Sequence, residues 1–284
     1  MTGVTVRPAV EEDVSVICDF VHRLADYEKL AHEVSFTELH YKNYLFLSKH
    51  EPAPEVILAC DDEHPIGMAL FIPLMTSTIH LEDLFVLPEA RGKGAGIALL
   101  SALAKMAVQR GALALEWSCL DWNKSSLDFY ASLGARPIPA RTLFRITGSA
   151  LRDRVPHKHR VNDIQEKSHE LDPRLRGLEL LDASGDVIGS LFYTLSFTTF
   201  LATPVILVTS IVSEAPFDST VELIDHLISI ANANHYSRID LRVNPTIESD
   251  LAQRIVNEFG AFEMTGWIPH EISGEALLQL ASRS

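Results

Sequence analysis

Three closely spaced glycines constrain this chain more than any other feature of its sequence. The segment Arg91-Gly92-Lys93-Gly94-Ala95-Gly96 stands between an expected strand, 79–87, and an expected helix that starts at about residue 97. Glycines at such a position let the backbone approach a ligand closely and turn its N–H groups inward. The free N–H groups of a first helical turn, with the positive end of the helix dipole, favour an anion. We therefore expect a pyrophosphate here, although a glycine-rich surface turn taken alone has the same composition.

The spacing of these glycines excludes two well-known phosphate loops. A Rossmann loop follows the pattern Gly-x-Gly-x-x-Gly, and a Walker loop ends in Gly-Lys followed by Ser or Thr. Here Lys93 is followed by Gly94, and the order is Arg-Gly-x-Gly-x-Gly. The loop is therefore neither of these two.

Strand and helix patterns alternate around the loop. Apolar residues at helical spacing and an acidic first turn predict an amphipathic helix from Glu11 to Leu30. The turn-prone segment 61–65 joins two expected strands. A short helix from Asn123 is expected to stop at Gly134. These patterns predict an α/β (α+β) unit whose strands are 4–7, 55–60, 66–72, 79–87, 113–119 and 143–146.

The second half of the chain repeats the order of the first, which indicates an internal duplication. Its expected strand 205–213, helix 221–233 and strand 238–243 follow the same sequence of elements. We expect a first domain at 1–150, a charged linker at 151–170 and a degenerate second domain at 171–284. We expect the second copy to lack the long amphipathic helix of the first, and its glycine loop is replaced.

The glycine loop is replaced in the second copy by Pro216-Phe217-Asp218-Ser219. Proline has no N–H to donate, and Asp218 would place a negative charge where the pyrophosphate belongs. Ser219 with Glu222 matches a capping box, which would satisfy the start of the helix internally. We expect the second copy to bind no pyrophosphate.

Composition narrows the range of partners. The net charge is −14, and a strongly acidic chain is a poor candidate for binding nucleic acid, so no nucleic-acid partner is expected. An acidic surface instead attracts cations, including small polyamines. No apolar run reaches about 18 residues, and the first residues lack the pattern of a signal peptide, so we expect no membrane association.

Cysteine and histidine spacing predicts neither disulfides nor a metal. Cys18, Cys60 and Cys119 are far apart, and we expect three reduced, mostly buried thiols in a cytoplasmic protein. The pair His157 and His159 has no third ligand nearby, and a solvated linker explains this charged segment better. No metal is expected.

Several motifs together resemble the GNAT N-acetyltransferases. The loop follows a strand that ends in Val-x-Pro-x-x-Arg, and Asn123, Phe129-Tyr130 and Leu133-Gly134 match the closing helix of that family. The resemblance covers residues 4 to about 148. It implies tandem GNAT-like domains, each with a mixed, mainly antiparallel sheet flanked by helices, and acetyl-CoA as co-substrate.

The chain is most similar, within that superfamily, to the spermidine/spermine and thialysine N-acetyltransferases. The residues that carry this resemblance are Val6-Arg7-Pro8-Ala9, Leu24-Ala25-Asp26-Tyr27-Glu28, Leu81-Glu82-Asp83-Leu84-Phe85-Val86, the glycine loop, Trp122-Asn123 and Phe129-Tyr130. The resemblance implies acetyl transfer to a primary amine of a small cationic metabolite, directly in a ternary complex and without a covalent enzyme intermediate.

The resemblance also implies roles for individual residues. Glu82 is the expected base and Tyr130 the expected acid, because an alkylamine near pH 7 must lose a proton before it attacks. His80 shares a strand face with Glu82, and either a proton relay or a structural role fits it. The expected acceptor-binding residues are Tyr27, Glu28 and Asp83. The expected cofactor-binding residues are Leu84, Phe85, Val86, Arg91, Gly92, Lys93, Gly94, Ala95, Gly96, Asn123 and Ser126.

Two other functions remain open at this point. One is acetylation of an aminoglycoside-like compound or a protein amine, which would require a wider cleft. The other is a non-catalytic acyl-CoA-binding module. The second half would serve as a pseudo-dimer partner, a cover over the amine pocket or a surface for self-association, so both a homodimer and an intramolecular pseudo-dimer are compatible with the sequence.

Overall fold

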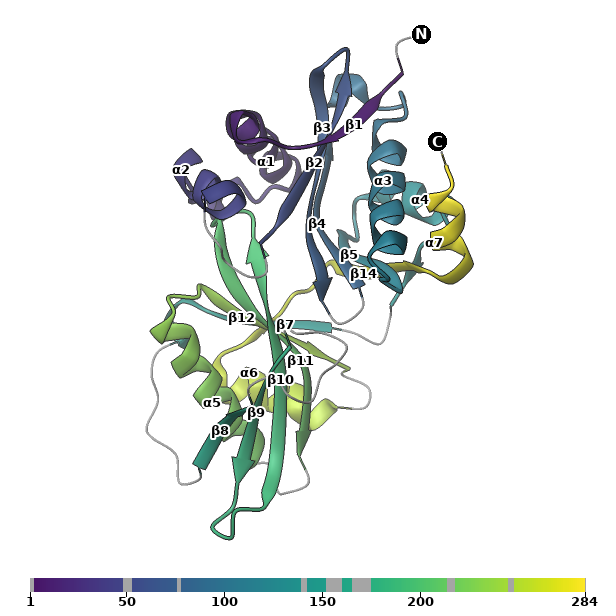
Figure 1. The fold of residues 1–284 in the computed structure, drawn as a ribbon. Helices are drawn as coiled ribbons and strands as arrows, with labels where there is room; N and C mark the ends of the chain where they lie inside the picture. Colours follow the sequence, from purple (N-terminus) through teal and green to yellow (C-terminus); the bar gives the residue numbers. More distant parts are fainter. Residues whose placement is uncertain are drawn as a thin grey trace. The chain divides into compact units, whose positions relative to one another are not determined.

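The computed structural model contains two compact units, each built on a seven-stranded mixed sheet (Figure 1). It describes residues 3–47, 53–75, 78–138, 142–151, 160–164, 175–213, 218–244 and 248–283. The first unit comprises residues 1–138, 197–203 and 266–284, and the second comprises 139–196 and 204–265. Each unit therefore includes segments from both halves of the sequence.

The sheet of the first unit has the order β1-β2-β3-β4-β5-β14-β6. Neighbouring strands are antiparallel except β4 and β5, which are parallel. The strands are β1 (Thr5–Pro8), β2 (Glu55–Asp61), β3 (His64–Met75), β4 (Thr78–Val86), β5 (Ala114–Leu120), β6 (Arg136–Pro137) and β14 (Trp267–Ser273).

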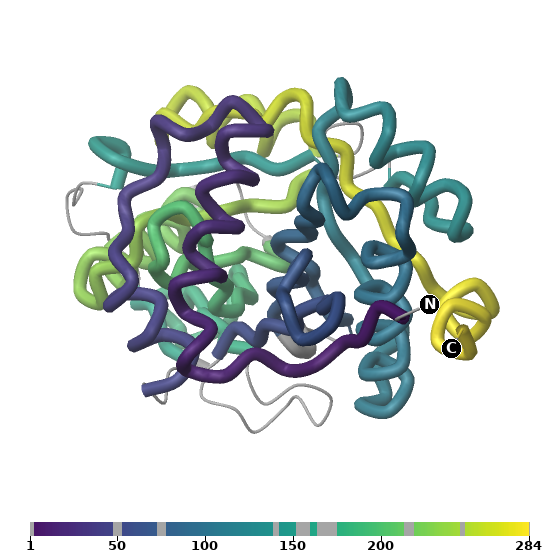
Figure 2. The backbone as a smooth tube through the Cα atoms, turned by 90° about the horizontal axis from the view of Figure 1, so that it is seen from above, coloured from purple at the N-terminus to yellow at the C-terminus, as the bar shows by residue number. Residues whose placement is uncertain are grey.

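Helices flank both faces of this sheet. The apolar faces of α3 (Ala95–Gln109), α4 (Lys124–Ser132) and α7 (Gly274–Ala281) share one core cluster with the strands, and α7 lies beside α3 (Figures 1 and 2). The other face carries α1 (Val14–Glu28), preceded by the 3-10 turn η1 (Glu11–Asp13), and then η2 (Ala31–Glu33), α2 (Glu38–Lys42) and η3 (Asn43–Leu47).

Local chemistry explains where these elements start and stop. The expected helix from Glu11 to Leu30 is confirmed, although it begins as the 3-10 turn and ends at Glu28, because Lys29 adopts a left-handed conformation with φ of 64°. Asp13 accepts the N–H of Val10 at 2.8 Å and pairs with Arg7 at 2.6 Å, which ties the helix start to β1. Asp13, an acidic residue of the first turn, therefore has a structural role in holding this helix against β1.

The second unit is built in the same way. Its strands follow the order β13-β7-β12-β11-β10-β9-β8, and β11 pairs with β12 in parallel. They are β7 (Thr142–Thr147), β8 (Arg160–Ile164), β9 (Arg176–Leu181), β10 (Val187–Thr198), β11 (Thr203–Ser213), β12 (Arg238–Val243) and β13 (Phe262–Glu263). The helices α5 (Asp218–Ala233) and α6 (Ser249–Phe259), with the turn η5 (Gly148–Leu151), pack on a second core cluster.

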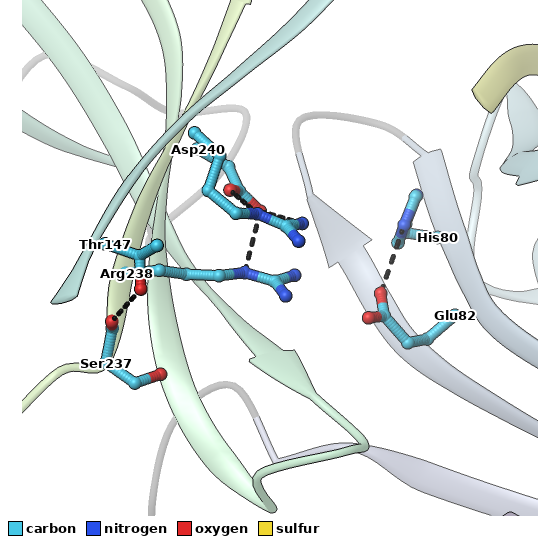
Figure 3. Close-up of polar contacts among 7 residues, drawn as sticks. His80, Glu82, Thr147, Ser237, Arg238 and Asp240 are labelled. Carbon is cyan, nitrogen blue, oxygen red and sulfur yellow. Dashed lines mark hydrogen bonds and ion pairs between the residues drawn. The ribbon is translucent and has the colours of Figure 1, made fainter. Parts of the chain in front are cut away.

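A polar cluster joins two strands of the second unit. The guanidinium of Arg145 on β7 donates to Asp240 on β12 at 2.8 Å, and Arg238 pairs with the same carboxylate at 2.9 Å (Figure 3). Thr147 donates to the carbonyl of Ser237 at 3.1 Å. These contacts fix the register of β7 against β12, where Asp240 stands opposite Arg145.

The two sheets confirm the predicted duplication and add an exchange of strands. Read from β8 to β13, the second sheet repeats the order of the first, with its parallel pair in the same position. The sixth strand of each sheet comes from the other half: β7 completes the second sheet and β14 the first. The prediction that 143–146 closes the first unit is therefore wrong, because this strand pairs with β12.

The division expected at residues 150 and 170 also differs from the compact units. β8 lies within the expected linker and pairs with β9, and the C-terminal elements β14 and α7 belong to the first unit. Helix α5 is described from Asp218, and the capping box expected of Ser219 with Glu222 stays a prediction. His157, His159, Pro216 and Phe217 lie outside the described residues.

In the part of the chain that the structure describes, no helix combines the length and apolar character needed to cross a bilayer. The three cysteines are free and buried.

Candidate active site

A β-bulge interrupts the pairing of β4 with β3 at Glu82. Leu70 stands opposite Asp83 and its neighbour Phe71 stands opposite Leu81, so Glu82 is an extra residue in β4. A bulge of this kind bends the strand and redirects side chains.

The bulge places two consecutive carboxylates on one side of the sheet. Leu81 lies in the core cluster beneath α3, and Leu84 packs against the same cluster. Two residues rather than one separate them, so Glu82 and Asp83 both turn to the opposite side. That side faces α1, as the 5.4 Å separation of the Phe20 and Phe85 rings shows. Alternation alone would have placed the two carboxylates on opposite faces.

A third carboxylate joins them from the last turn of α1. Burial, followed by repulsion from Glu82 and Glu33, raises the pKa of Glu28 to about 7. Burial, followed by repulsion from Glu82 and Glu28, raises the pKa of Asp83 well above its usual range. Glu28, Glu82 and Asp83 thus form an acidic cluster in which mutual repulsion and burial favour the uptake of positive charge, by protonation or by a bound cation.

His80 lies beside this cluster. Its Nε2 is 3.4 Å from Oε2 of Glu82, and the two side chains are only 16% and 18% exposed (Figure 3). Its Nδ1 is buried with no hydrogen-bond partner among the described residues. The expected shared face of His80 and Glu82 is confirmed by this close approach of their side chains.

The parallel strands β4 and β5 separate next to Glu82. They pair only from Thr78 opposite Ala114 to His80 opposite Glu116. Both strands continue, β4 to Val86 and β5 to Leu120, and no further pairing between them occurs in the described residues. The backbone groups of Leu84, Phe85 and Val86 on this edge are therefore not used by β5, and an extended ligand could take the place of a strand there.

The glycine loop follows β4 in the chain, beside the opening that forms where β4 and β5 separate. Gly92 and Gly94 have φ values of 75° and 93°, which side-chain-bearing residues rarely adopt. Gly94 is the N-cap residue of α3, and the first helical bond runs from the N–H of Ala98 to its carbonyl at 2.9 Å. The N–H groups of residues 95–97 therefore lie ahead of the helical hydrogen-bond pattern, where helix N-termini are able to bind an anion.

The remaining loop residues have distinct positions. The side chain of Ala95 is buried in the core, so only its backbone faces outward. A side chain added at Gly96 would lie 3.4 Å from the ring of Phe129. Arg91 donates to the carbonyl of Val86 at 3.1 Å, and its guanidinium lies 5.1 Å from the ring centre of Tyr27. Lys93 is exposed.

Tyr27 connects the loop with α4. Its hydroxyl donates to Oδ1 of Asn123 at 3.0 Å, and the same oxygen accepts the N–H of Ser126 at 3.3 Å. The phenol that we expected to hold the amine is thus engaged on the side of the cofactor loop. Asn123 and Ser126, both expected to bind the cofactor, come together at the start of α4.

Tyr130 is buried within a group of aromatic rings. Its ring centre lies 4.9 Å from that of Trp117 and 6.2 Å from that of His270. Burial, followed by the nearby Cys119 and Glu28, raises the pKa of Tyr130 above its usual range, so the phenol keeps its proton. No sequence pattern pointed to His270, because β14 reaches this position only through the strand exchange.

A turn from the second half of the sequence lies near the acidic cluster. Residues 197–203, from the end of β10 to the start of β11, belong to the first unit. Thr199 is buried close to Asp83, and its carbonyl accepts the hydroxyl of Tyr41 at 2.8 Å. The one available signal was composition: the turn Thr199-Phe200-Leu201-Ala202 is largely apolar, whereas exposed turns are usually polar.

Comparisons with known proteins identify the family of the chain. Residues 21–135 match the Acetyltransferase (GNAT) family. The thialysine N-epsilon-acetyltransferase of Sus scrofa is 30% identical over 166 residues, which cover 54% of this chain and 98% of the relative. The L-ornithine N5-acetyltransferase of Arabidopsis thaliana is 28% identical over 51% of this chain and 85% of the relative.

Solved structures share the two-unit fold. A tandem GNAT protein from the clavulanic acid biosynthesis pathway has a TM-score of 0.55 at 16% identity, with 99% of both chains covered. A GCN5-related N-acetyltransferase from Sphaerobacter thermophilus has a TM-score of 0.57 at 14% identity, with 95% of both chains covered. The chain therefore belongs to the GNAT family of N-acetyltransferases, whose co-substrate is acetyl-CoA.

Proposed function

We propose that this chain moves the acetyl group of acetyl-CoA to a primary amine of a small cationic metabolite, a polyamine or a thialysine-like amino acid, by direct transfer in a ternary complex. The observation that carries the proposal is the bulge in β4. It turns Glu82 and Asp83 to the same side as Glu28, immediately beside the opening between β4 and β5. A cationic amine and an extended thioester would meet there.

The residues of this site fit the co-substrate. The N–H groups at the start of α3 and the guanidinium of Arg91 would hold its pyrophosphate. Its extended arm would lie along Leu84-Phe85-Val86, with Asn123 and Ser126 at the other side. The backbone N–H groups around Phe85 and Val86 would stabilise the oxyanion that develops on the thioester oxygen.

In this proposal the acidic cluster binds the acceptor and removes its proton. Asp83, Glu28 and Tyr27 would hold the cationic acceptor, and Glu82 would take the proton that the reacting nitrogen loses, directly or through water. The nitrogen then bonds to the acetyl carbon while the carbon–sulfur bond breaks. Tyr130 would protonate the departing thiolate. Burial raises the pKa of Cys119 to about 11, so its thiol stays protonated, which supports transfer without a covalent enzyme intermediate.

The second repeat has a different role in this proposal. It lacks the glycine loop, and we propose that it acts as the partner of the first repeat in an intramolecular pseudo-dimer. The matching strand order and the exchange of β7 and β14 support this role. Three free buried thiols support a cytoplasmic location.

The test is to incubate the protein with acetyl-CoA and a panel of amines and to follow release of free thiol. The panel contains spermidine, spermine, thialysine, lysine, ornithine, an aminoglycoside and a short peptide with a free N-terminus. Turnover of one small cationic amine, reduced by roughly 100-fold or more in Glu82→Gln and Tyr130→Phe, is expected. Glu12→Gln, at an exposed residue, and Tyr236→Phe, in the second unit, are the matched controls.

Preference for the aminoglycoside or the peptide would instead support acetylation of an aminoglycoside-like compound or a protein amine. Calorimetric binding of acetyl-CoA without turnover of any amine would exclude the proposed transferase activity and favour an acyl-CoA-binding module.

A further inference from the structure

We propose that Trp117 is a further catalytic residue of this site: its indole N–H donates a hydrogen bond to the sulfur of the co-substrate and stabilises the negative charge that gathers there as the carbon–sulfur bond breaks. The inference rests on the proposed function, because it names the group that receives the departing thiolate together with Tyr130. It adds to that function a side chain that the acid–base chemistry described above does not use.

The indole of Trp117 carries a hydrogen-bond donor that the fold leaves unused. Trp117 is only 3% exposed, and its Nε1 is buried with no hydrogen-bond partner among the described residues. An indole N–H is a donor only, and a buried tryptophan usually has a partner for it. A buried donor without a partner is costly, and a ligand atom that accepts the bond removes this cost. The indole therefore favours a ligand that brings an acceptor atom.

Trp117 stands where the opening between β4 and β5 begins. The last pair of these two strands joins His80 to Glu116, so Trp117 is the first residue of β5 beyond the pairing. Its side chain lies on the face of the sheet that carries α3 and α4, and its ring centre is 4.9 Å from that of Tyr130, the proposed acid. The unused donor and the phenol thus lie together at the end of the site where the thioester sulfur would be.

His270 holds the indole in place. It stands opposite Trp117 on β14, and the two ring planes are within 7° of parallel, with their centres 6.2 Å apart. Because a carbonyl oxygen only accepts, Nδ1 of His270 carries the proton in its 2.8 Å hydrogen bond to the carbonyl of Ile268. This bond fixes the imidazole, and the fixed imidazole limits rotation of the indole beside it. The indole N–H is therefore preorganised for a ligand.

The second repeat has apolar residues at the corresponding positions. Phe144 stands opposite Leu241 there, as His270 stands opposite Trp117 in the first sheet, because β7 and β14 occupy the same place in the two sheets. Leu241 is still paired with β11, so the strands have not separated at that point. Counted back from the glycine that follows each helix, Val256 replaces the proposed acid. The repeat without the glycine loop thus lacks both the tyrosine and the indole donor.

Tyr130 by itself is a weak acid in this place. Burial raises the pKa of Tyr130 above its usual range, so negative charge builds up on the sulfur before the phenol gives up its proton. The electron pair of the breaking carbon–sulfur bond stays on the sulfur, and Tyr130 then supplies the proton that completes the thiol. The indole keeps its own proton throughout. Because the sulfur of an intact thioester carries little charge, the indole contact is strongest in the transition state and raises kcat more than affinity.

The experiment replaces Trp117 by 3-benzothienylalanine, which keeps the two fused rings and has sulfur in place of the N–H. Trp267 receives the same replacement as the matched control, since it lies three residues before His270 on β14 and thus on the opposite face of the sheet. We expect kcat with the preferred amine to fall about 10- to 100-fold at Trp117, and the KM values for acetyl-CoA and the amine to stay within about threefold. The control should stay within about twofold in all three quantities.

Thermal unfolding of both variants checks that the ring replacement leaves the fold intact. An unchanged kcat in the Trp117 variant, a rise in KM for acetyl-CoA that exceeds the fall in kcat, or an equal loss of kcat in the control would overturn the proposal.

A binding measurement without turnover distinguishes this inference from the proposed function. Calorimetry at about pH 9, above the ordinary thiol pKa of about 8.5, compares CoA with desulfo-CoA, which lacks the sulfur. The preference of the original chain for CoA over desulfo-CoA should fall about tenfold in the Trp117 variant and stay in place in the Trp267 variant. An unchanged preference in the Trp117 variant would overturn the contact with sulfur.

The two proposals fail in different ways. Absence of turnover on every amine, with the preference for CoA still dependent on Trp117, would overturn the proposed function and the catalytic role of Trp117 while leaving its contact with the sulfur established. Turnover of a small cationic amine that is the same with and without the indole N–H would overturn the inference and leave the proposed function intact.

Discussion

The hydroxyl of Tyr27 donates a 3.0 Å hydrogen bond to Oδ1 of Asn123, which joins the last turn of α1 to the first turn of α4. The ring of the same tyrosine lies 5.1 Å from the guanidinium of Arg91. One side chain thus connects the acidic cluster at Glu28, the glycine loop and the start of α4. Its position suggests that Tyr27 affects binding of the co-substrate as well as binding of the amine.

Tyr27→Phe should therefore weaken binding of acetyl-CoA by about 3- to 10-fold, because Asn123 loses the partner that orients its amide group. The ring that stacks with Arg91 is retained in this variant, so the loop itself should stay in place. The measurement is the KM for acetyl-CoA at saturating amine, with Tyr236→Phe as the control. A KM unchanged within error would show that the hydrogen bond has no role in binding.

Arg91→Glu should reduce binding of acetyl-CoA by roughly 100-fold or more, because it replaces a cation beside the pyrophosphate site with an anion. Arg23→Glu makes the same change in net charge on the exposed face of α1 and should leave binding unchanged. Asp218→Gly in the second repeat should create no new acetyl-CoA site. Calorimetry gives both the affinity and the number of sites, and a second site in Asp218→Gly would contradict our view of that repeat.

Gly94→Ala should destabilise the fold by about 1–2 kcal/mol, because a side chain at φ of 93° strains the backbone. An added Cβ meets no atom within 4 Å at this position, so the effect is conformational and not steric. Gly3→Ala also meets no atom within 4 Å, and Gly3 has no strained φ, which makes it the matched control. Urea denaturation measures both; equal stability of the two variants would refute the argument from strain.

Glu28→Gln should make the chain more stable at pH 8 by about 1–3 kcal/mol and have little effect below pH 4. Because the pKa of Glu28 is raised from 4.5 to about 7, the folded chain binds more protons than the unfolded chain between these values. Its contribution to stability is therefore present below about pH 4.5 and is lost as pH rises through 7. The raised pKa of Asp83 changes stability with pH in the same direction. Part of the pH dependence of the free energy of unfolding should therefore remain in Glu28→Gln.

The measurement is the free energy of unfolding from pH 4 to pH 8, with the exposed Glu12→Gln as the control. A pH profile of Glu28→Gln parallel to that of the original chain would show that Glu28 is not a buried acid.

A fragment of residues 1–150 should not unfold as a cooperative unit. It lacks β14, which lies between β5 and β6 in the first sheet, and it carries β7 without its partner β12. Circular dichroism during heating and size-exclusion chromatography would compare the fragment with the full chain. A monomeric fragment with a sharp thermal transition would show that the strand exchange is dispensable for folding.

Much of the local structure follows from spacing that is visible in the sequence. Gly134, with φ of 86°, stands just beyond α4 as predicted, and Gly92 and Gly94 adopt positive φ values that glycine permits. The repeated order of elements predicted the duplicated sheet correctly. These features depend on each residue's own backbone freedom and on contacts between near neighbours, which the order of residues specifies directly.

The carboxylate pair illustrates where such reasoning stops. Strict alternation along β4 separates Glu82 from Asp83, and only the pairing of Leu70 and Phe71 across the bulge turns both to one side. A bulge is a property of two strands together, so the pattern within one strand does not reveal it.

The sequence by itself determined the family resemblance, the glycine loop and the two repeats. The tertiary structure alone decided that β7 and β14 change places, that His270 lies beside Tyr130, and that the turn at Thr199 contacts Tyr41 in the first unit. In a duplicated chain, equivalent strands carry similar patterns, so local preference cannot distinguish one partner from the other. The choice rests on the packing and hydrogen bonding of the whole chain, which bring together residues that are distant in the sequence.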